Sequence, residues 1–200
     1  MIRRFIASLA RLATGVRLLP VTPHGTGPAI YFANHASHMD FVVVWAALPD
    51  EVRDLTSPAA AEDYWGATAL RRRIACGLFR AILIPRQDVT RQNNPVDRLG
   101  AGLNTGRSII IFPEGTRNTS AETAEFKSGL YHLAKRFPHL PLVPVQLENL
   151  SRILPKGSRL LVPLIAQARF GDPIHILEGE SKPDFLTRAR ATLVEMNRAD

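Results

Sequence analysis

Short apolar runs alternate along this chain with longer segments of mixed polarity. The runs are too short for helices and rich in β-branched residues, so they predict buried strands at 29–33, 81–84, 108–112, 142–147, 159–162 and 167–170. The longer segments predict helices at about 40–48, 61–79, 94–105, 128–137 and 184–198. This alternation predicts an α/β fold, in which helices flank a mostly parallel central sheet.

The first residues follow a different pattern, in which arginines are set among apolar residues at helical spacing. The apolar positions are Ile2, Phe5, Ile6, Leu9, Leu12, Ala13, Val16 and Leu19, and the basic ones are Arg3, Arg4, Arg11 and Arg17. The pattern predicts an amphipathic helix, which either lies on a lipid surface or packs on the domain as an ordinary first helix. We divide the chain into this helix with its loop, residues 1–27, and a single domain, residues 28–200.

The composition narrows the partners that the domain can have. Lys and Arg number 25 against 18 Asp and Glu, and the net charge of +7 favours an anionic partner. Only 7% of the residues are aromatic and no nucleic-acid-binding motif is present, which argues against DNA and RNA. Because Cys76 is the single cysteine, we expect no disulfide framework, no zinc site and a reducing compartment.

A histidine and a carboxylate follow the first predicted strand, in Asn34-His35-Ala36-Ser37-His38-Met39-Asp40. Histidine is the side chain best suited to take a proton from an alcohol near neutral pH, and a carboxylate can hold its tautomer. If His35 ends the strand and Asp40 begins the next helix, the turn between them lets the two side chains meet. We therefore predict a catalytic pair of His35 and Asp40, with Asn34 bonding the loop backbone and Ser37 capping the next helix.

The spacing alone is weak evidence for this pair. In an average chain about one histidine in eight has an acidic residue five positions later, and this sequence has six histidines. His175 and Glu180 have the same spacing, but they lie near the C-terminus without a strand, a loop and a helix around them. The position after a buried strand distinguishes His35 and Asp40 from a chance pair.

A polar loop with the features of an anion site follows the predicted strand at 108–112. Gly115 permits a close backbone approach, Thr116 offers a hydroxyl, and Arg117 presents a fork that matches phosphate oxygens. Glu114 repels phosphate unless it pairs with a cation or a hydroxyl. We therefore expect Glu114 to orient Arg117 or a polyol.

Two further cations are candidates for the same site. Arg86 follows another short predicted strand, and Lys127 is either a second cation near the site or a surface residue. In a parallel α/β sheet the ligand crevice lies outside the carboxyl ends of the strands. The polar residues that follow the strands, including His35 and the loop at 113–117, are therefore expected to meet at one edge.

These blocks together resemble the glycerolipid acyltransferase superfamily, and the lysophosphatidic acid acyltransferases in particular. His35 with Asp40 is similar to the family's catalytic HX4D block, and residues 112–118 are similar to its acceptor-binding block. Residues 83–86 are similar to a block that ends in a substrate-binding arginine, although Arg80 stands where a glycine is usual. The resemblance covers roughly residues 28–175 and also includes Leu142-Val143-Pro144-Val145 and Phe126-Lys127-Ser128-Gly129.

The resemblance implies an O-acyltransferase that moves a fatty acyl group from an acyl thioester to the free hydroxyl of a lysophospholipid. The implied acceptor is 1-acylglycerol 3-phosphate, which gives phosphatidate, and the implied donor is an acyl carrier protein or coenzyme A thioester, with no further cofactor and no metal. His35 would deprotonate the acceptor and Asp40 would stabilise the imidazolium. The implied acceptor-binding residues are Arg86, Glu114, Gly115, Thr116 and Arg117.

Other acceptors and another class of function are the alternatives. Glycerol 3-phosphate or a lyso-aminolipid would suit the same chemistry, and a non-catalytic lipid-binding protein at a membrane surface would suit the basic first helix. No stretch approaches the roughly 20 consecutive apolar residues that a transmembrane helix needs. We therefore expect a peripheral protein on the cytoplasmic face of a membrane.

Overall fold

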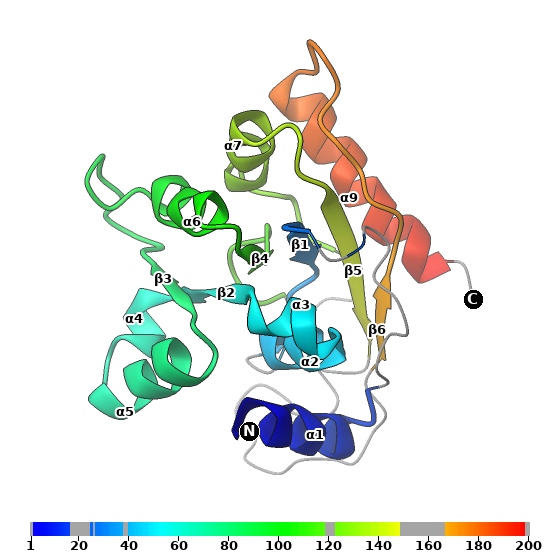
Figure 1. The fold of residues 1–200 in the computed structure, drawn as a ribbon. Coiled ribbons are helices and arrows are strands. Elements are labelled where there is room, and N and C mark those ends of the chain that lie inside the picture. Colours follow the sequence, from blue (N-terminus) through cyan, green and yellow to red (C-terminus); the bar gives the residue numbers. More distant parts are fainter. Residues whose placement is uncertain are drawn as a thin grey trace.

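The computed structural model describes residues 2–16, 25, 27–37, 40–118, 123–148 and 167–198 of the 200-residue chain. A central sheet carries helices on both faces (Figure 1). The strands are β1 (Ile30–Ala33), β2 (Thr56–Ala61), β3 (Ile82–Ile84), β4 (Ser108–Ile111), β5 (Leu142–Glu148) and β6 (Gln167–Phe170). The helices of the described residues are α1 (Ile2–Thr14), α2 (Asp40–Ala47), α3 (Asp50–Asp54), α4 (Glu62–Trp65), α5 (Ala69–Arg72), the π-helix η1 (Arg73–Leu78), α6 (Pro95–Asn104), α7 (Gly129–Arg136) and α9 (Lys182–Arg198).

The six strands follow the order β3-β2-β4-β1-β5-β6 across the sheet. The strands β3, β2, β4, β1 and β5 run parallel to one another, and β6 pairs with β5 in the antiparallel direction. The predicted α/β fold with a mostly parallel sheet is confirmed. The strand predicted at 159–162 lies outside the described residues.

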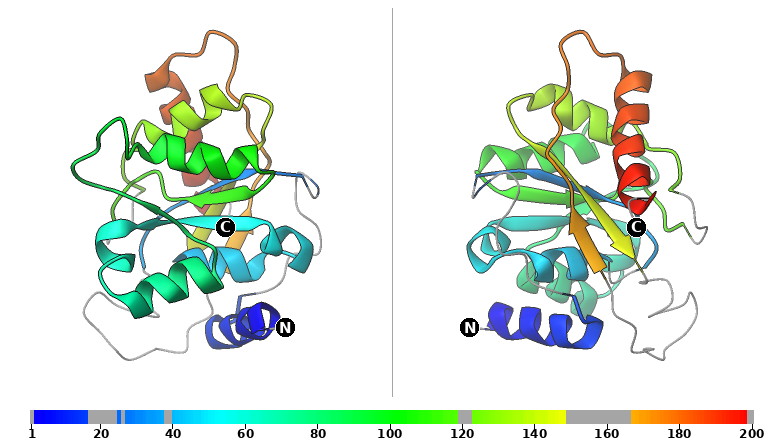
Figure 2. Two further views of the ribbon diagram at one scale, coloured as in Figure 1. Left: turned by 60° about the vertical axis from the view of Figure 1, so that its left-hand side comes forward. Right: turned by 90° about the vertical axis from the view of Figure 1, so that its right-hand side faces the viewer.

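Both faces of the sheet are buried, which explains why its strands are continuous apolar runs. In β1, Ile30 and Phe32 belong to the core formed with α6, α7 and α9, whereas Tyr31 and Ala33 face the core formed with α1 and α2. All four side chains are fully buried. Figure 2 shows the resulting layers, with α1 lying outside α2.

The amphipathic helix α1 packs on the domain through its small residues and turns its large apolar residues outward. Ala7 and Ala10 are buried against the α2 side, and the arginines there donate to backbone carbonyls, Arg3 to Arg53 and Arg11 to Ala46, both at 3.2 Å. The strongly exposed outward residues are Ile2, Phe5, Leu9 and Leu12. Leu12 is the most exposed of them, at 83%. No helix of the described residues is long and apolar enough to cross a bilayer.

The structure corrects the prediction for the region that precedes β3. Instead of one helix at 61–79, the chain ends β2 at Ala61 and then forms α4, α5 and η1. Thr68 is extended, with φ −135° and ψ 150°, and its hydroxyl accepts the N–H of Arg71 at 3.2 Å, so α5 starts anew. No pattern in the sequence predicted β2, because Pro58 and a run of alanines have low strand propensity.

Candidate active site

His35 lies two residues after the end of β1, and Asp40 is the first residue of α2. The histidine Nδ1 lies 2.7 Å from Oδ2 of Asp40. The same oxygen accepts the backbone N–H groups of Ala36 and Ser37, at 2.7 Å and 2.8 Å. The strand end, the loop and the first helical turn therefore bring the predicted pair together, as the sequence suggested.

The two side chains of this pair differ in exposure. The Asp40 side chain is fully buried, while that of His35 is 20% exposed and lines a cavity. Two backbone N–H groups and the N-terminus of α2 stabilise the carboxylate charge, so the histidine tautomer that fits this contact carries its hydrogen on Nδ1 and donates it to Asp40. A neutral histidine that donates from Nδ1 has its lone pair on Nε2, at the opposite side of the ring.

The backbone of His35 is held by the loop that follows β4. Its N–H donates to Oε1 of Glu114 at 2.7 Å, and its carbonyl accepts the N–H of Asn118 at 2.7 Å. Its ring stacks on Phe112, with centroids 4.4 Å apart and an interplanar angle of 24°. Because β1 and β4 are neighbours in the sheet, the two loops meet, and these contacts hold the histidine from the side of β4.

Asn34 bonds backbone groups as expected, although they belong to β5 and not to its own loop. The Asn34 side chain exchanges two hydrogen bonds with the backbone of Leu147 in β5, at 2.9 Å and 2.7 Å. The backbone carbonyl of Ser37 accepts the N–H of Asp40 at 3.2 Å, and a cap of α2 by the Ser37 side chain stays a prediction. Asn34 therefore ties the loop between β1 and α2 to a third strand.

The second pair with the same spacing, His175 and Glu180, does not form a dyad. Glu180 accepts two hydrogen bonds from Arg188, each at 2.7 Å, and they hold the pKa of its carboxyl below the usual range. His175 contributes its backbone carbonyl to the same arginine. Elsewhere in the described residues, no group of three His, Cys, Asp or Glu side chains could hold a metal ion.

Glu114 has other partners than the predicted ones. Its side chain is buried, and while Oε1 accepts from His35, Oε2 accepts the N–H of Ala124 at 3.1 Å. These two backbone amides would lose their acceptor without the carboxylate. Glu114 thus fastens the histidine loop and the segment before α7 to the loop after β4, and it does not orient Arg117.

A cavity of about 740 Å³ opens beside His35 at the carboxyl ends of the parallel strands. Its walls are apolar side chains of β2, β3 and β4 on one side and of α6 and α7 on the other, among them Ala59, Ile84, Ile111, Leu99, Leu130 and Leu133. Charged and polar residues also line it, among them Arg86, Asp97, Lys127 and His132. Such a cavity suits a molecule that combines an alkyl portion with an anionic group.

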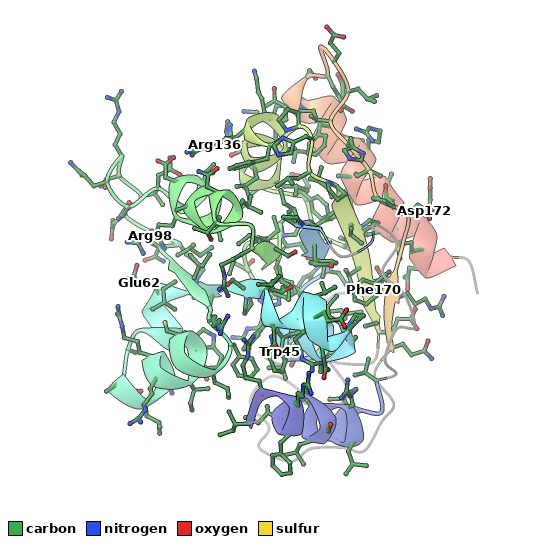
Figure 3. The ribbon with its side chains drawn as sticks, viewed as in Figure 1. Trp45, Glu62, Arg98, Arg136, Phe170 and Asp172 are labelled. Atoms are coloured by element: carbon green, nitrogen blue, oxygen red, sulfur yellow. The ribbon has the colours of Figure 1, made fainter. Side chains whose placement is uncertain are left out.

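One arginine fastens α6 to the strand and helix next to this cavity. Arg98 donates to a carboxylate oxygen of Glu62 in α4 at 2.8 Å and to the carbonyl of Leu83 in β3 at 2.9 Å. Figure 3 shows Arg98 and Glu62 turned toward one another. The wall formed by α6 is therefore tied to the sheet edge.

Only part of the predicted acceptor-binding set reaches the cavity. Gly115 and Arg86 line it, whereas Glu114, exposed Thr116 and half-buried Arg117 are not among its lining residues. Gly115 has a φ of +72°, a conformation that glycine adopts without strain.

Arg86 already has a partner at the edge of the cavity. Its guanidinium makes a two-point ion pair with Asp63, in which Nε lies 3.2 Å from Oδ1. The hydrogen bond from Arg86 lowers the pKa of the Asp63 carboxyl. The sequence did not single out Asp63, because the pattern placed it inside a longer helix.

With this fold and this dyad, the comparisons with known proteins agree on a family. Residues 13–148 match the sequence model of the family described as Acyltransferase, and the chain belongs to that family. The family resemblance inferred from the motifs is confirmed.

Several relatives carry the same name. The chain is 26% identical over 174 residues to the 1-acyl-sn-glycerol-3-phosphate acyltransferase alpha of Ovis aries, covering 86% of this chain and 58% of that protein. It is 28% identical over 135 residues to the Mus musculus protein of that name, covering 67% and 45%. It is 29% identical over 160 residues to the 1-acyl-sn-glycerol-3-phosphate acyltransferase of Limnanthes douglasii, which covers 76% of this chain and 52% of that protein. The chain thus spans about half the length of these relatives.

A solved structure has the same fold. The crystal structure of the 1-acyl-sn-glycerophosphate (LPA) acyltransferase PlsC from Thermotoga maritima superposes with a TM-score of 0.77. The match covers all of this chain and 80% of that chain, at 18% sequence identity. At this identity the likeness establishes the fold alone.

Removal of the Glu114 carboxylate should loosen the histidine loop. Because Glu114→Ala leaves two backbone N–H groups without their acceptor, it should lower the free energy of unfolding by about 1–3 kcal/mol, measured by urea denaturation. Glu125→Ala, which changes an exposed glutamate in the same segment, should have an effect below about 0.5 kcal/mol. Equal stability of the two variants would contradict the role of Glu114 as a fastening between loops.

Proposed function

We propose that this chain transfers a fatty acyl group from an acyl thioester to the free hydroxyl of a lysophospholipid, with 1-acylglycerol 3-phosphate as acceptor and phosphatidate as product. One observation carries the proposal: His35, held by Asp40, lines a cavity whose walls are apolar and whose lining includes cations. Membership of the Acyltransferase family and the names of the relatives support the same reaction.

The reaction needs a base that later acts as an acid. His35 Nε2 takes the proton of the acceptor hydroxyl while the hydroxyl oxygen attacks the thioester carbonyl carbon, and Asp40 stabilises the imidazolium. The tetrahedral intermediate then collapses, the carbon–sulfur bond breaks, and the imidazolium returns its proton to the departing thiolate. The acyl group passes directly to the acceptor without a covalent acyl-enzyme.

The cavity offers apolar walls to the alkyl chain of a substrate and cations to its anionic group. Its apolar walls suit an alkyl chain, whose burial contributes about 0.8 kcal/mol for each methylene. The donor is the thioester of an acyl carrier protein or of coenzyme A. The acceptor brings an anionic group to the cations among the lining residues.

The outward face of α1 supports a membrane surface as the place of this reaction. A surface helix of a soluble protein normally buries its large apolar side chains and exposes its charged ones. Helix α1 does the opposite, because its arginines bond the domain while it exposes Ile2, Phe5, Leu9 and Leu12. Insertion of these side chains at the lipid interface removes them from water. We propose that α1 holds the chain peripherally on the cytoplasmic face of a membrane, where the lysophospholipid is found.

Substitution of the dyad should remove the transfer activity. With an acyl carrier protein or coenzyme A thioester as donor, His35→Ala should lower kcat by about 10³-fold or more, and Asp40→Asn by about 10²–10⁴-fold. The measurement is the formation of diacyl product from lysophosphatidate. His175→Ala is the matched control, since the side chain of this exposed histidine lies outside the cavity.

A panel of acceptors in the same assay decides between the alternatives. Faster turnover of glycerol 3-phosphate or of a lyso-aminolipid would replace the acceptor and keep the mechanism. Equal turnover by His35→Ala and the unaltered protein would refute the dyad. An unaltered protein that binds lipid but transfers no acyl group would favour the non-catalytic alternative.

Polar substitutions on the outward face of α1 should weaken membrane binding. The double substitution Phe5→Glu with Leu12→Glu should reduce partitioning onto vesicles of anionic phospholipid by about tenfold or more, since each large apolar side chain contributes about 1.5–3 kcal/mol. Cosedimentation with vesicles measures this. Leu177→Glu, at a 59% exposed position in the segment between β6 and α9, is the control. This segment reaches the end of the molecule opposite α1 (Figure 1). Equal losses in both variants would mean that α1 is not the lipid-binding surface.

A further inference from the structure

Lys127 is a cavity-lining cation that lies just before α7. Its side chain is exposed, and no carboxylate of the described residues pairs with its ammonium group. Arg86, the other permanently charged cation in the lining, is already held by Asp63 at two points. Lys127 is therefore the lining cation whose charge is available to a ligand.

The side chain of Lys127 lies against the backbone of Gly115. A Cβ atom on Gly115 would be 2.8 Å from Cδ and Cε of Lys127 and 3.2 Å from its Nζ. The backbone N–H of Lys127 also donates to the carbonyl of Pro113 at 2.8 Å. Glycine at this position thus gives the lysine the space to lie along the loop.

The same loop carries the groups that hold the histidine. Glu114, which precedes Gly115 in the sequence, and Asn118, which follows it, both form hydrogen bonds with the backbone of His35. The ammonium group of Lys127 therefore lies over the loop that fixes the base, inside a cavity that both side chains line. Arg117, which carries the forked guanidinium expected at the site, is not among the lining residues.

We propose that Lys127 binds the phosphate monoester of the acceptor, an assignment that rests on the proposed acyl transfer. In a 1-acylglycerol 3-phosphate only a short glycerol fragment separates the reacting hydroxyl from the phosphate, so a cation that lines the same cavity as the base is placed to bind it. The phosphates of coenzyme A or of a carrier protein are separated from the thioester by the whole pantetheine arm. A lysine acts on phosphate as a point charge with three rotatable donors, which tolerates movement of the acceptor during attack.

The binding test uses acceptor analogues that cannot react. Calorimetry compares 1-acyl-2-O-methylglycerol 3-phosphate with 1-acyl-2-O-methylglycerol, which lacks the phosphate. Lys127→Met should weaken binding of the phosphate analogue by about tenfold or more and leave binding of the phosphate-free analogue unchanged, because a charge-assisted hydrogen bond is lost. Lys127→Arg should retain a large part of the affinity, and Lys182→Met, at an exposed lysine in the first turn of α9, should bind as the unaltered protein does.

A kinetic test separates the acceptor phosphate from the donor phosphates. Lys127→Met should raise the KM for lysophosphatidate by about tenfold or more while the KM for an acyl-coenzyme A stays unchanged. The KM for an acyl N-acetylcysteamine thioester, a donor without phosphate, should also be unchanged, and the KM for the acceptor should rise equally with either donor. A rise confined to the KM of the coenzyme A donor would overturn the assignment.

The remaining outcomes distinguish this assignment from the proposed reaction. Unchanged affinity in Lys127→Met, or equal losses for both analogues, would refute the phosphate contact even if the unaltered protein transfers acyl groups. If that protein transfers none, a loss of phosphate-dependent binding in Lys127→Met still supports the lysine site, and the reaction alone fails. Lys127→Gln repeats the test with a polar side chain if the methionine variant does not fold.

Discussion

The hydrogen bond between His35 and the buried carboxylate of Asp40 is the constraint on which the site depends. A buried charge costs free energy unless donors compensate it. Oδ2 of Asp40 has the ring nitrogen and two backbone amides as partners, whereas its buried Oδ1 has none among the described residues. All three donors lie in the loop between β1 and α2, so the loop folds around the carboxylate. The same contact sets which histidine nitrogen carries the proton and which one can accept another.

The fold supplies the rest of the site by placing strand ends next to one another. Because β4, β1 and β5 are adjacent and parallel, Glu114, His35 and Leu147 meet at one edge of the sheet, and hydrogen bonds join the three chain segments there. Phe112 stacks on the imidazole from the same edge. The histidine is therefore positioned by three strands, while α6 and α7 add the wall of the cavity in front of it. The cavity is thus enclosed by the strands, whose ends also carry the histidine, and by the two helices.

The sequence predicted what depends on local pattern and missed what depends on three-dimensional position. Apolar runs identified most strands, since a sheet buried on both faces needs them, but Pro58 and its neighbouring alanines concealed β2. The dyad was identifiable because the strand, loop and helix around it are consecutive in the chain. Arg117 fits a phosphate by its chemistry but does not line the cavity, whereas Lys127, which the sequence left ambiguous, does. Glu114 was assigned to a substrate because the chain order does not show that the amide of His35 lies beside it.

The protonation of His35 in the free protein tests the central claim most directly. Nitrogen-15 NMR distinguishes a ring nitrogen that carries hydrogen from one that does not, and it needs no substrate. At a pH where the imidazole is neutral, we expect hydrogen on Nδ1, donated to Asp40, and a bare Nε2, with this preference reduced or reversed in Asp40→Asn. Hydrogen on Nε2 in the unaltered protein, or the same tautomer ratio with and without the carboxylate, would contradict the account.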